Sequence, residues 1–177
     1  MIILMGVAGA GKSVEGKRLS DEKGLPWLST GEFLRILVTG QRRREMLAGK
    51  LLDDQEMIAL ADRIFRIIDT KEEFILDGFP RTPDQAEWLY AQHKAGLLKI
   101  TCILHLEASE AVVKERLLGR GRVDDTEDVI SKRFAEYHSV TLPILHDLEA
   151  KGVKVTHINS ERDQEHVHAD VLAALEG

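Results

Sequence analysis

"MIILMGVAGAGKS", residues 1–13, is the stretch of sequence that decides the fold. Its first five residues are apolar and are followed by glycine, a pattern typical of a buried parallel strand. Residues 11–24 then have helical character and end at a glycine. The sequence therefore predicts a strand, a glycine-rich loop and a helix in direct succession.

The glycine-rich loop, Gly6 to Ser13, fits the pattern G-x-x-x-x-G-K-[ST]. Glycines let the backbone curl so that several N–H groups point at one anion, and the helix N-terminus adds about half a positive charge. Lys12 supplies a full charge for β- and γ-phosphates, and the Ser13 hydroxyl can ligate Mg²⁺. The loop thus predicts a nucleotide-phosphate site. GTPase switches, transport ATPases and small-molecule kinases share it, and the length of the chain favours the kinases.

Strands and helices alternate along the rest of the chain. Further strands are predicted over residues 72–80, 99–107 and 153–159. Helices are predicted over residues 29–40, 41–50, 53–70, 82–96, 109–121, 126–152 and 164–177, with Pro143 as a candidate bend in the longest. This alternation predicts a doubly wound α/β fold, in which helices cover both faces of a parallel sheet and ligands sit at the carboxyl ends of the strands.

The overall composition limits the classes of function. A length of 177 residues predicts one domain, and a formal net charge of −6 argues against general nucleic-acid binding, with Arg42 to Arg44 as a small basic exception. The single cysteine, Cys102, excludes an intrachain disulfide and a cysteine-based zinc site, and it fits a reducing cytoplasm. The apolar start is too short for a signal sequence or a membrane span, so no membrane partner is expected.

The stretch "FILDGFPRTPDQAEW", residues 74–88, predicts a second group of site residues. Asp77 ends a predicted strand beside the glycine-rich loop, where a carboxylate could act near Mg²⁺. Arg81 has the planar guanidinium that suits a phosphate. The plainer alternatives are a cap or turn for Asp77 and a surface ion pair for Arg81.

Arginines also gather in "LLGRGRVDDTED", residues 117–128. Arg120 and Arg122 flank one glycine, and Asp124 and Asp125 follow at once. The two arginines predict an anion site, because guanidinium groups bind phosphate oxygens with two donors each. For the aspartates two readings stay open: they pair with these arginines, or they cap the helix that follows.

Four stretches resemble the adenylate kinases of the nucleoside monophosphate kinase family. They are "GVAGAGKS", "STGEFLR", "LDGFPRTPDQAE" and "GRGRVDDTEDVISKR", at residues 6–13, 29–35, 76–87 and 119–133. They stand in the family's order and span nearly the whole chain. The resemblance implies a five-stranded sheet of the P-loop NTPase type. It also implies one kinase domain over 1–177, with an inserted monophosphate-binding segment at about 29–58 and a short lid at about 119–127.

The resemblance further implies transfer of the ATP γ-phosphoryl group to AMP, giving two ADP. The ATP side would be formed by Gly9, Ala10, Gly11, Lys12, Ser13, Val14, Arg116, Arg120 and Arg162. The AMP side would be formed by Thr30, Arg35, Lys50, Leu51, Leu52, Gly78, Phe79, Pro80, Arg81, Gln85, Arg122 and Arg133, with Gln85 at the adenine edge. The catalytic residues would be Lys12, Arg81, Arg120, Arg122 and Arg133, with Ser13 and Asp77 holding Mg²⁺ partly through water.

The chain departs from the family's pattern at several positions. Val14 and Glu15 follow the loop where Thr and Gln are usual, and Glu32 replaces an Asp. The AMP-side insertion is also shorter than usual. A kinase for another nucleoside monophosphate or small metabolite, or a nucleotide-binding regulator with little turnover, therefore stays open.

The expected partners are ATP, AMP and ADP, bound by a monomer. Zinc is not expected, because the lid has no cysteine or histidine and the seven histidines show no metal-binding spacing.

Overall fold

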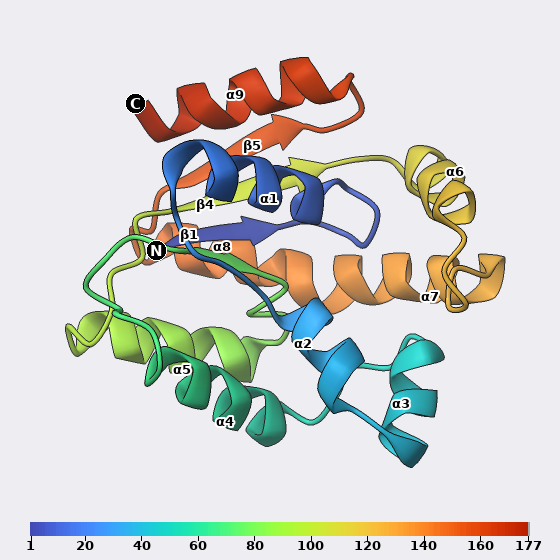
Figure 1. The fold of residues 1–177 in the computed structure, drawn as a ribbon, viewed down its shortest axis with the longest axis horizontal. Coiled ribbons are helices and arrows are strands. Elements are labelled where there is room, and N and C mark those ends of the chain that lie inside the picture. Colours follow the sequence, from blue (N-terminus) through green and yellow to red (C-terminus); the bar gives the residue numbers. More distant parts are fainter. Residues whose placement is uncertain (177) are drawn as a thin grey trace.

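The computed structural model describes residues 1–176, in which one parallel sheet lies between two layers of helices (Figure 1). The strand order is β2-β3-β1-β4-β5, and every neighbouring pair is parallel. The strands are β1 (Ile2–Met5), β2 (Trp27–Ser29), β3 (Ile75–Asp77), β4 (Cys102–Glu107) and β5 (Val155–Asn159). The predicted doubly wound α/β fold with a five-stranded sheet is confirmed.

Strand β2 is the element that the residue pattern missed. It has three residues, which is too short for hydrophobic periodicity to show. It pairs with β3, where Trp27 lies opposite Ile75 and Ser29 opposite Asp77. The fifth strand had been implied by the resemblance alone, and its position at the sheet edge follows from long-range pairing.

Helices cover both faces of the sheet. Helices α1 and α9 lie on one face, and α4, α5 and α8 lie on the other (Figure 1). The helices are α1 (Lys12–Lys23), α2 (Thr30–Leu37), α3 (Gly40–Leu47), α4 (Asp54–Phe65), α5 (Pro83–Lys94), α6 (Glu110–Arg120), α7 (Glu127–Glu136), α8 (Leu142–Ala150) and α9 (Gln164–Glu176). Within residues 1–176, each helix is too short or too polar to cross a bilayer.

The long helix predicted over residues 126–152 is interrupted. A π-helical turn, η1 (Tyr137–Thr141), separates α7 from α8. Pro143 explains the interruption, because proline has no N–H to donate and its ring crowds the carbonyl four residues earlier. The irregular turn therefore precedes the proline, and it presents Tyr137 toward the carboxyl edge of the sheet.

The centre of the sheet fixes the position of the glycine-rich loop. Ile3 and Leu4 of β1 are fully buried, as are Ile103 and Leu104 of β4. The loop starts at Gly6, which has a φ of 145°. A Cβ there would lie 2.4 Å from the Leu106 carbonyl oxygen, so a side chain would clash with the neighbouring strand. The loop therefore leaves a rigid core directly at the carboxyl edge.

Candidate active site

The first wall of the site is the glycine-rich loop with the N-terminus of α1. This 12-residue helix begins at Lys12 after Gly11, whose φ is 101°. Within the described residues no side chain caps this N-terminus. Its first N–H groups are therefore oriented for a bound anion and carry the positive end of the helix dipole.

Lys12 is held over the loop by main-chain carbonyls. Its Nζ donates to the Gly6 oxygen at 2.7 Å and to the Val7 oxygen at 2.9 Å. Burial lowers the pKa of Lys12 to about 8, although the negative charge of Asp77 opposes that shift. Near neutral pH the Lys12 side chain is therefore a cation, which can bind an anionic group of a ligand.

Ser13 and Asp77 lie together beside Lys12. The Ser13 hydroxyl donates to Asp77 Oδ2 at 3.0 Å, although the two residues are 64 positions apart. Both side chains supply oxygen, which is the donor atom that Mg²⁺ prefers, and Mg²⁺ usually keeps several waters at such a site. The pair has the donor atoms that Mg²⁺ held partly through water would need, and the predicted metal role of Ser13 and Asp77 stays a prediction.

Arg81 follows β3 and faces the same space. Its Nε donates to the Gly78 carbonyl at 2.8 Å. Burial lowers the pKa of Arg81, with Asp77 acting against the shift and Arg133 and Arg35 reinforcing it. Gly78 has a φ of 84°, and a Cβ there would lie 2.7 Å from Thr30 Oγ1. The glycine thus permits the turn that directs Arg81 inward.

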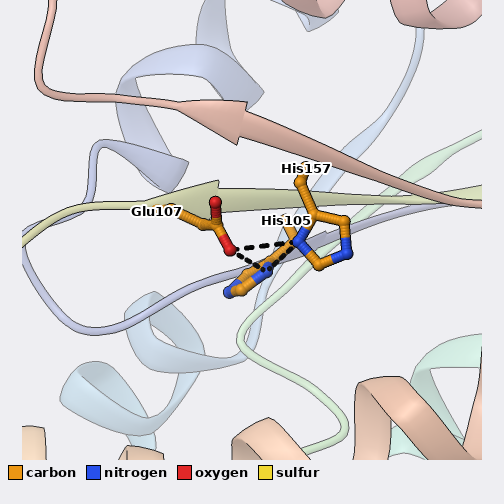
Figure 2. Close-up of side chains that lie close together, drawn as sticks. All are labelled: His105, Glu107 and His157. Carbon is orange, nitrogen blue, oxygen red and sulfur yellow. Dashed lines mark hydrogen bonds and ion pairs between the residues drawn. The ribbon is translucent and has the colours of Figure 1, made fainter.

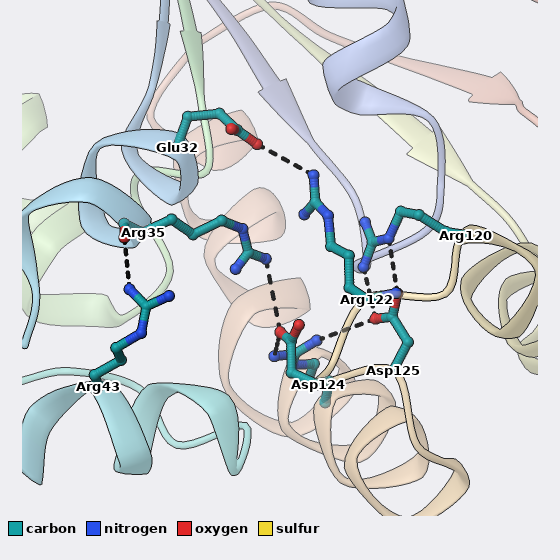
Figure 3. Close-up of polar contacts among 8 residues, drawn as sticks. Glu32, Arg35, Arg43, Arg120, Arg122, Asp124 and Asp125 are labelled. Carbon is teal, nitrogen blue, oxygen red and sulfur yellow. Dashed lines mark hydrogen bonds and ion pairs between the residues drawn. The ribbon is translucent and has the colours of Figure 1, made fainter.

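Four further arginines form what we call the arginine cluster: Arg35, Arg120, Arg122 and Arg133. Figure 3 shows Arg35, Arg120 and Arg122. They come from α2, from the end of α6 with the loop after it, and from α7. The two open readings for Asp124 and Asp125 are settled in favour of arginine pairing. The cap position of α7 is Thr126, and neither aspartate caps that helix.

The two aspartates form hydrogen bonds and ion pairs with arginines of the cluster. Arg120 donates to both oxygens of Asp125, at 2.8 and 2.7 Å. Arg133 donates to Asp124 at 2.5 Å, and Arg35 lies 3.7 Å from the same carboxylate. Burial opposes the charge of Asp124, but the hydrogen bond and charge of Arg133 outweigh it and lower its pKa. Asp124 therefore remains an anion that holds Arg133 in place, and Asp125 holds Arg120 through the two hydrogen bonds.

Arg122 is held differently. Its Nη2 lies 3.3 Å from Glu32 Oε1, across the gap between α2 and the loop after α6 (Figure 3). Glu32 is about half exposed, whereas the side chain of Asp125 is fully buried. The Arg122–Glu32 pair is therefore the contact that a ligand can most easily replace.

The loop, Arg81 and the arginine cluster line one cleft with a volume of about 450 Å³. The predicted residues that line it are Gly9, Ala10, Gly11, Lys12, Ser13, Val14, Arg35, Lys50, Leu51, Asp77, Gly78, Phe79, Pro80, Arg81, Arg116, Arg120, Arg122, Arg133 and Arg162. The guanidinium groups of the arginine cluster thus lie across the cleft from the main-chain N–H groups of the glycine-rich loop. Both sets of donors can bind phosphate oxygens.

Three predicted residues lie outside this lining. Leu52 borders an adjoining cavity of about 470 Å³. Thr30 is buried and donates to the Asp77 carbonyl at 3.2 Å. Gln85 is buried as well, where its Nε2 donates to Asp54 Oδ1 at 2.7 Å and its Oε1 accepts the Arg81 N–H at 2.9 Å. The structure gives Gln85 a positioning contact with Arg81, and its predicted contact with adenine stays a prediction.

Some lining residues were not anticipated from the sequence. Tyr137 enters the cleft from η1, and Ser160 and Gln164 enter from the end of β5 and the start of α9. The Arg116 guanidinium donates to the Ser160 carbonyl at 2.7 Å, which ties the arginine to that segment. The rule that ligands lie at carboxyl ends of parallel strands could have indicated Ser160. The position of Tyr137 in the cleft depends on the π-helical turn, and the sequence around Tyr137 does not predict that turn.

Comparison with known proteins gives a consistent result. The sequence model of the adenylate kinase family matches residues 4–153. A protein named adenylate kinase from Mycolicibacterium vanbaalenii is 36% identical over 180 residues, which cover 98% of each chain. Adenylate kinases from Corynebacterium aurimucosum and Nitrobacter hamburgensis are each 35% identical, over 98% and 99% of this chain and 97% and 91% of their own lengths.

Proposed function

The chain belongs to the adenylate kinase family, and from this premise we propose that it transfers the γ-phosphoryl group of ATP to AMP in the cleft described above. It is an ATP:AMP phosphotransferase that yields two ADP. The proposal rests on the observation that the phosphate loop and the arginine cluster line the same cleft. Lys12 of the phosphate loop and the arginines of the cluster border one space, as a transfer between two bound nucleotides requires.

The ATP side is the phosphate loop. The N–H groups from Gly9 to Val14 bind the triphosphate, and Lys12 exchanges its carbonyl partners for β- and γ-phosphate oxygens. Arg116 and Arg162 border the adenosine end of ATP. Ser13 and Asp77 would hold Mg²⁺, which would neutralise phosphate charge.

The AMP side is the segment from Gly78 to Arg81 with Arg35. Arg81 and Arg35 bind the AMP phosphate, and the buried Nε of Arg35, which has no partner among the described residues, is a donor left for it. Lys50, Leu51 and Leu52 border the adenosine.

In the transfer, an AMP phosphate oxygen forms a bond to the γ-phosphorus while the bond to the β,γ-bridging oxygen breaks, and ADP leaves. The attacking oxygen is already an anion, so no general base is needed. Charge spreads over the oxygens of the moving group, and Arg120, Arg122 and Arg133 stabilise it there. Segment 119–127, acting as a lid, excludes water that would otherwise hydrolyse ATP.

Further features complete the proposal. We propose a monomer in the cytoplasm that uses ATP with Mg²⁺ and binds neither nucleic acid nor a membrane. The domain spans residues 1–177, with the monophosphate-binding insertion at about 29–58. A buried free thiol, Cys102, fits a reducing compartment.

The test is a coupled assay with AMP, dAMP, CMP, UMP and GMP as acceptors, using the wild type and two variants. AMP should have the highest kcat/KM. Arg81→Ala should lower that value by about 10²–10³-fold, the usual effect of removing one donor from a transition-state site. Arg66→Ala is the matched control, because Arg66 forms an exposed pair with Asp62 on α4. A preference for another monophosphate, or an unimpaired Arg81→Ala enzyme, would contradict the proposal.

A further inference from the structure

A cluster of possible metal ligands lies between β4 and β5. It consists of His105 and Glu107 on β4 and His157 on β5 (Figure 2). His105 and His157 are direct neighbours in the register of the two strands. Their side chains point to the face of the sheet that carries α8, whereas α1 lies on the opposite face. The cluster is therefore distinct from the Ser13–Asp77 pair.

The distances within the cluster are those of a coordination triangle. The two Nδ1 atoms of His105 and His157 are 3.1 Å apart. Glu107 Oε1 lies 3.0 Å from His157 Nδ1 and 3.4 Å from His105 Nδ1. A tetrahedral zinc ion with ligands at about 2.0–2.1 Å places them about 3.3 Å from one another. The three atoms could thus surround an ion with shifts of a few tenths of an ångström.

The protonation of the cluster also suits a cation. A carboxylate can only accept, so the proton between His157 and Glu107 belongs to His157 Nδ1. A second proton on His105 Nδ1 would face it at 3.1 Å, so His105 carries its proton on Nε2. The lone pair of His105 Nδ1 therefore points into the cluster.

Tyr137 orients the buried histidine from behind. His105 Nε2 lies 2.7 Å from the Tyr137 hydroxyl, and the histidine is nearly fully buried. Metal-binding histidines usually donate their second N–H to such a partner, which fixes the ring and its tautomer. The second nitrogen of His157 points away from the cluster (Figure 2), so it can take the proton that an ion displaces from Nδ1.

We propose that His105, Glu107 and His157 form a zinc site with three protein ligands and a water in the fourth position. Two imidazoles and one carboxylate are a ligand set that zinc uses in proteins. His157 and Glu107 are about half exposed, so an ion can enter from solvent. Bound zinc joins the edge strand β5 to β4 and, through Tyr137, to η1. No zinc was expected from the sequence, because His157 is 50 residues from Glu107 and meets the other two ligands only by strand pairing.

The test is titration of the tag-free, nucleotide-free protein with ZnCl2, followed by calorimetry and by the unfolding temperature. The wild type should bind one ion per chain, and saturating zinc should raise the unfolding temperature by roughly 5 °C or more. Cobalt(II) should give the strong visible absorption of a tetrahedral site. His157→Gln should abolish this binding, and Tyr137→Phe should weaken it by roughly 10-fold, the usual effect of losing an orienting partner.

His166→Gln is the matched control. His166 also contacts a carboxylate, Asp163, on the surface at the start of α9, but it belongs to no three-ligand cluster among the described residues. This variant should bind zinc as the wild type does. A wild type that binds no ion, or binding that survives in His157→Gln, would overturn the proposal. Phosphotransfer by His157→Gln should stay at the wild-type level, so failure here is distinguishable from failure of the proposed function.

Discussion

The phosphate loop and the arginine cluster line the same cleft, but they hold their functional groups by different means. The loop uses main-chain atoms, and Lys12 is anchored to the carbonyls of Gly6 and Val7. In the cluster, each arginine is held by a carboxylate, and these carboxylates come from two segments far apart in sequence. One wall is therefore fixed by backbone geometry, and the other depends on charge pairs.

This difference separates permanent contacts from replaceable ones. Asp124 and Asp125 are almost fully buried and hold Arg133 and Arg120 in place, so they can stay when phosphates arrive. Glu32 is half exposed and reaches Arg122 from the other side of the cleft. A phosphate can take its place. The cluster thus contains a fixed part and an exchangeable part. The substitutions below test first the phosphate loop and then the exchangeable part of the cluster.

The largest effect on activity is expected at the phosphate loop, which main-chain contacts hold in place. Lys12→Met should lower kcat by about 10³-fold or more, because a buried charge at the moving phosphoryl group is lost and no neighbouring side chain replaces it. Lys23→Met is the control, since Lys23 ends the same helix and is exposed. Single-turnover kinetics would measure the loss. A reduction below tenfold would mean that the main-chain amides alone carry the function of this wall.

The pH dependence of ATP binding tests the same wall more finely. The pKa of Lys12 in the free protein is about 8, below its ordinary 10.5, and bound phosphates favour the charged form. ATP affinity should therefore fall as the pH rises above about 8, by up to about tenfold per pH unit.

Calorimetry with a non-hydrolysable ATP analogue between pH 7 and 9.5 would measure this effect. In buffers of different ionisation enthalpy, the data should show proton uptake near pH 8.5. Lys12→Met should bind more weakly at every pH and should lose the dependence. A wild-type affinity that stays constant up to pH 9.5 would show that Lys12 keeps its ordinary pKa.

The contrast between local main-chain contacts and charge pairs between distant segments also explains which parts of the structure could be predicted from the sequence. The phosphate loop is a local feature, and its residues were predicted together with the strand and helix around it. Charge pairs are not local. His168, for example, hydrogen-bonds to Glu15 at 2.8 Å and to Glu22 at 2.9 Å, and it is 153 residues from Glu15. Burial opposes the charged ring, but the hydrogen bonds to Glu22 and Glu15 outweigh it and raise its pKa.

That contact gives a physical reason for one departure from the family's pattern. Glu15 stands where the family usually has glutamine, and it is buried with His168 as its partner. His168 is buried because α9 packs against α1, and the sequence around His168 does not show this contact. Strand β2 was missed for a similar reason, since pairing with β3 rather than its own three residues defines it.

The smallest effect is expected at the exchangeable pair. Glu32→Gln removes the carboxylate that lies 3.3 Å from Arg122, together with a negative charge that a phosphate would meet on entry. Exposed ion pairs contribute about 0.2–1 kcal/mol, so nucleotide affinity should rise by about 1.4- to fivefold. Asp62→Asn is the matched control, because it breaks an exposed pair between Asp62 of α4 and Arg66 directly after that helix. Equilibrium binding of ADP at low and high salt would measure the change, and the gain should shrink at high salt because screening already weakens the pair. Weaker binding in Glu32→Gln would instead mean that Glu32 positions Arg122 for the phosphate, which would place this pair with the fixed part of the cluster.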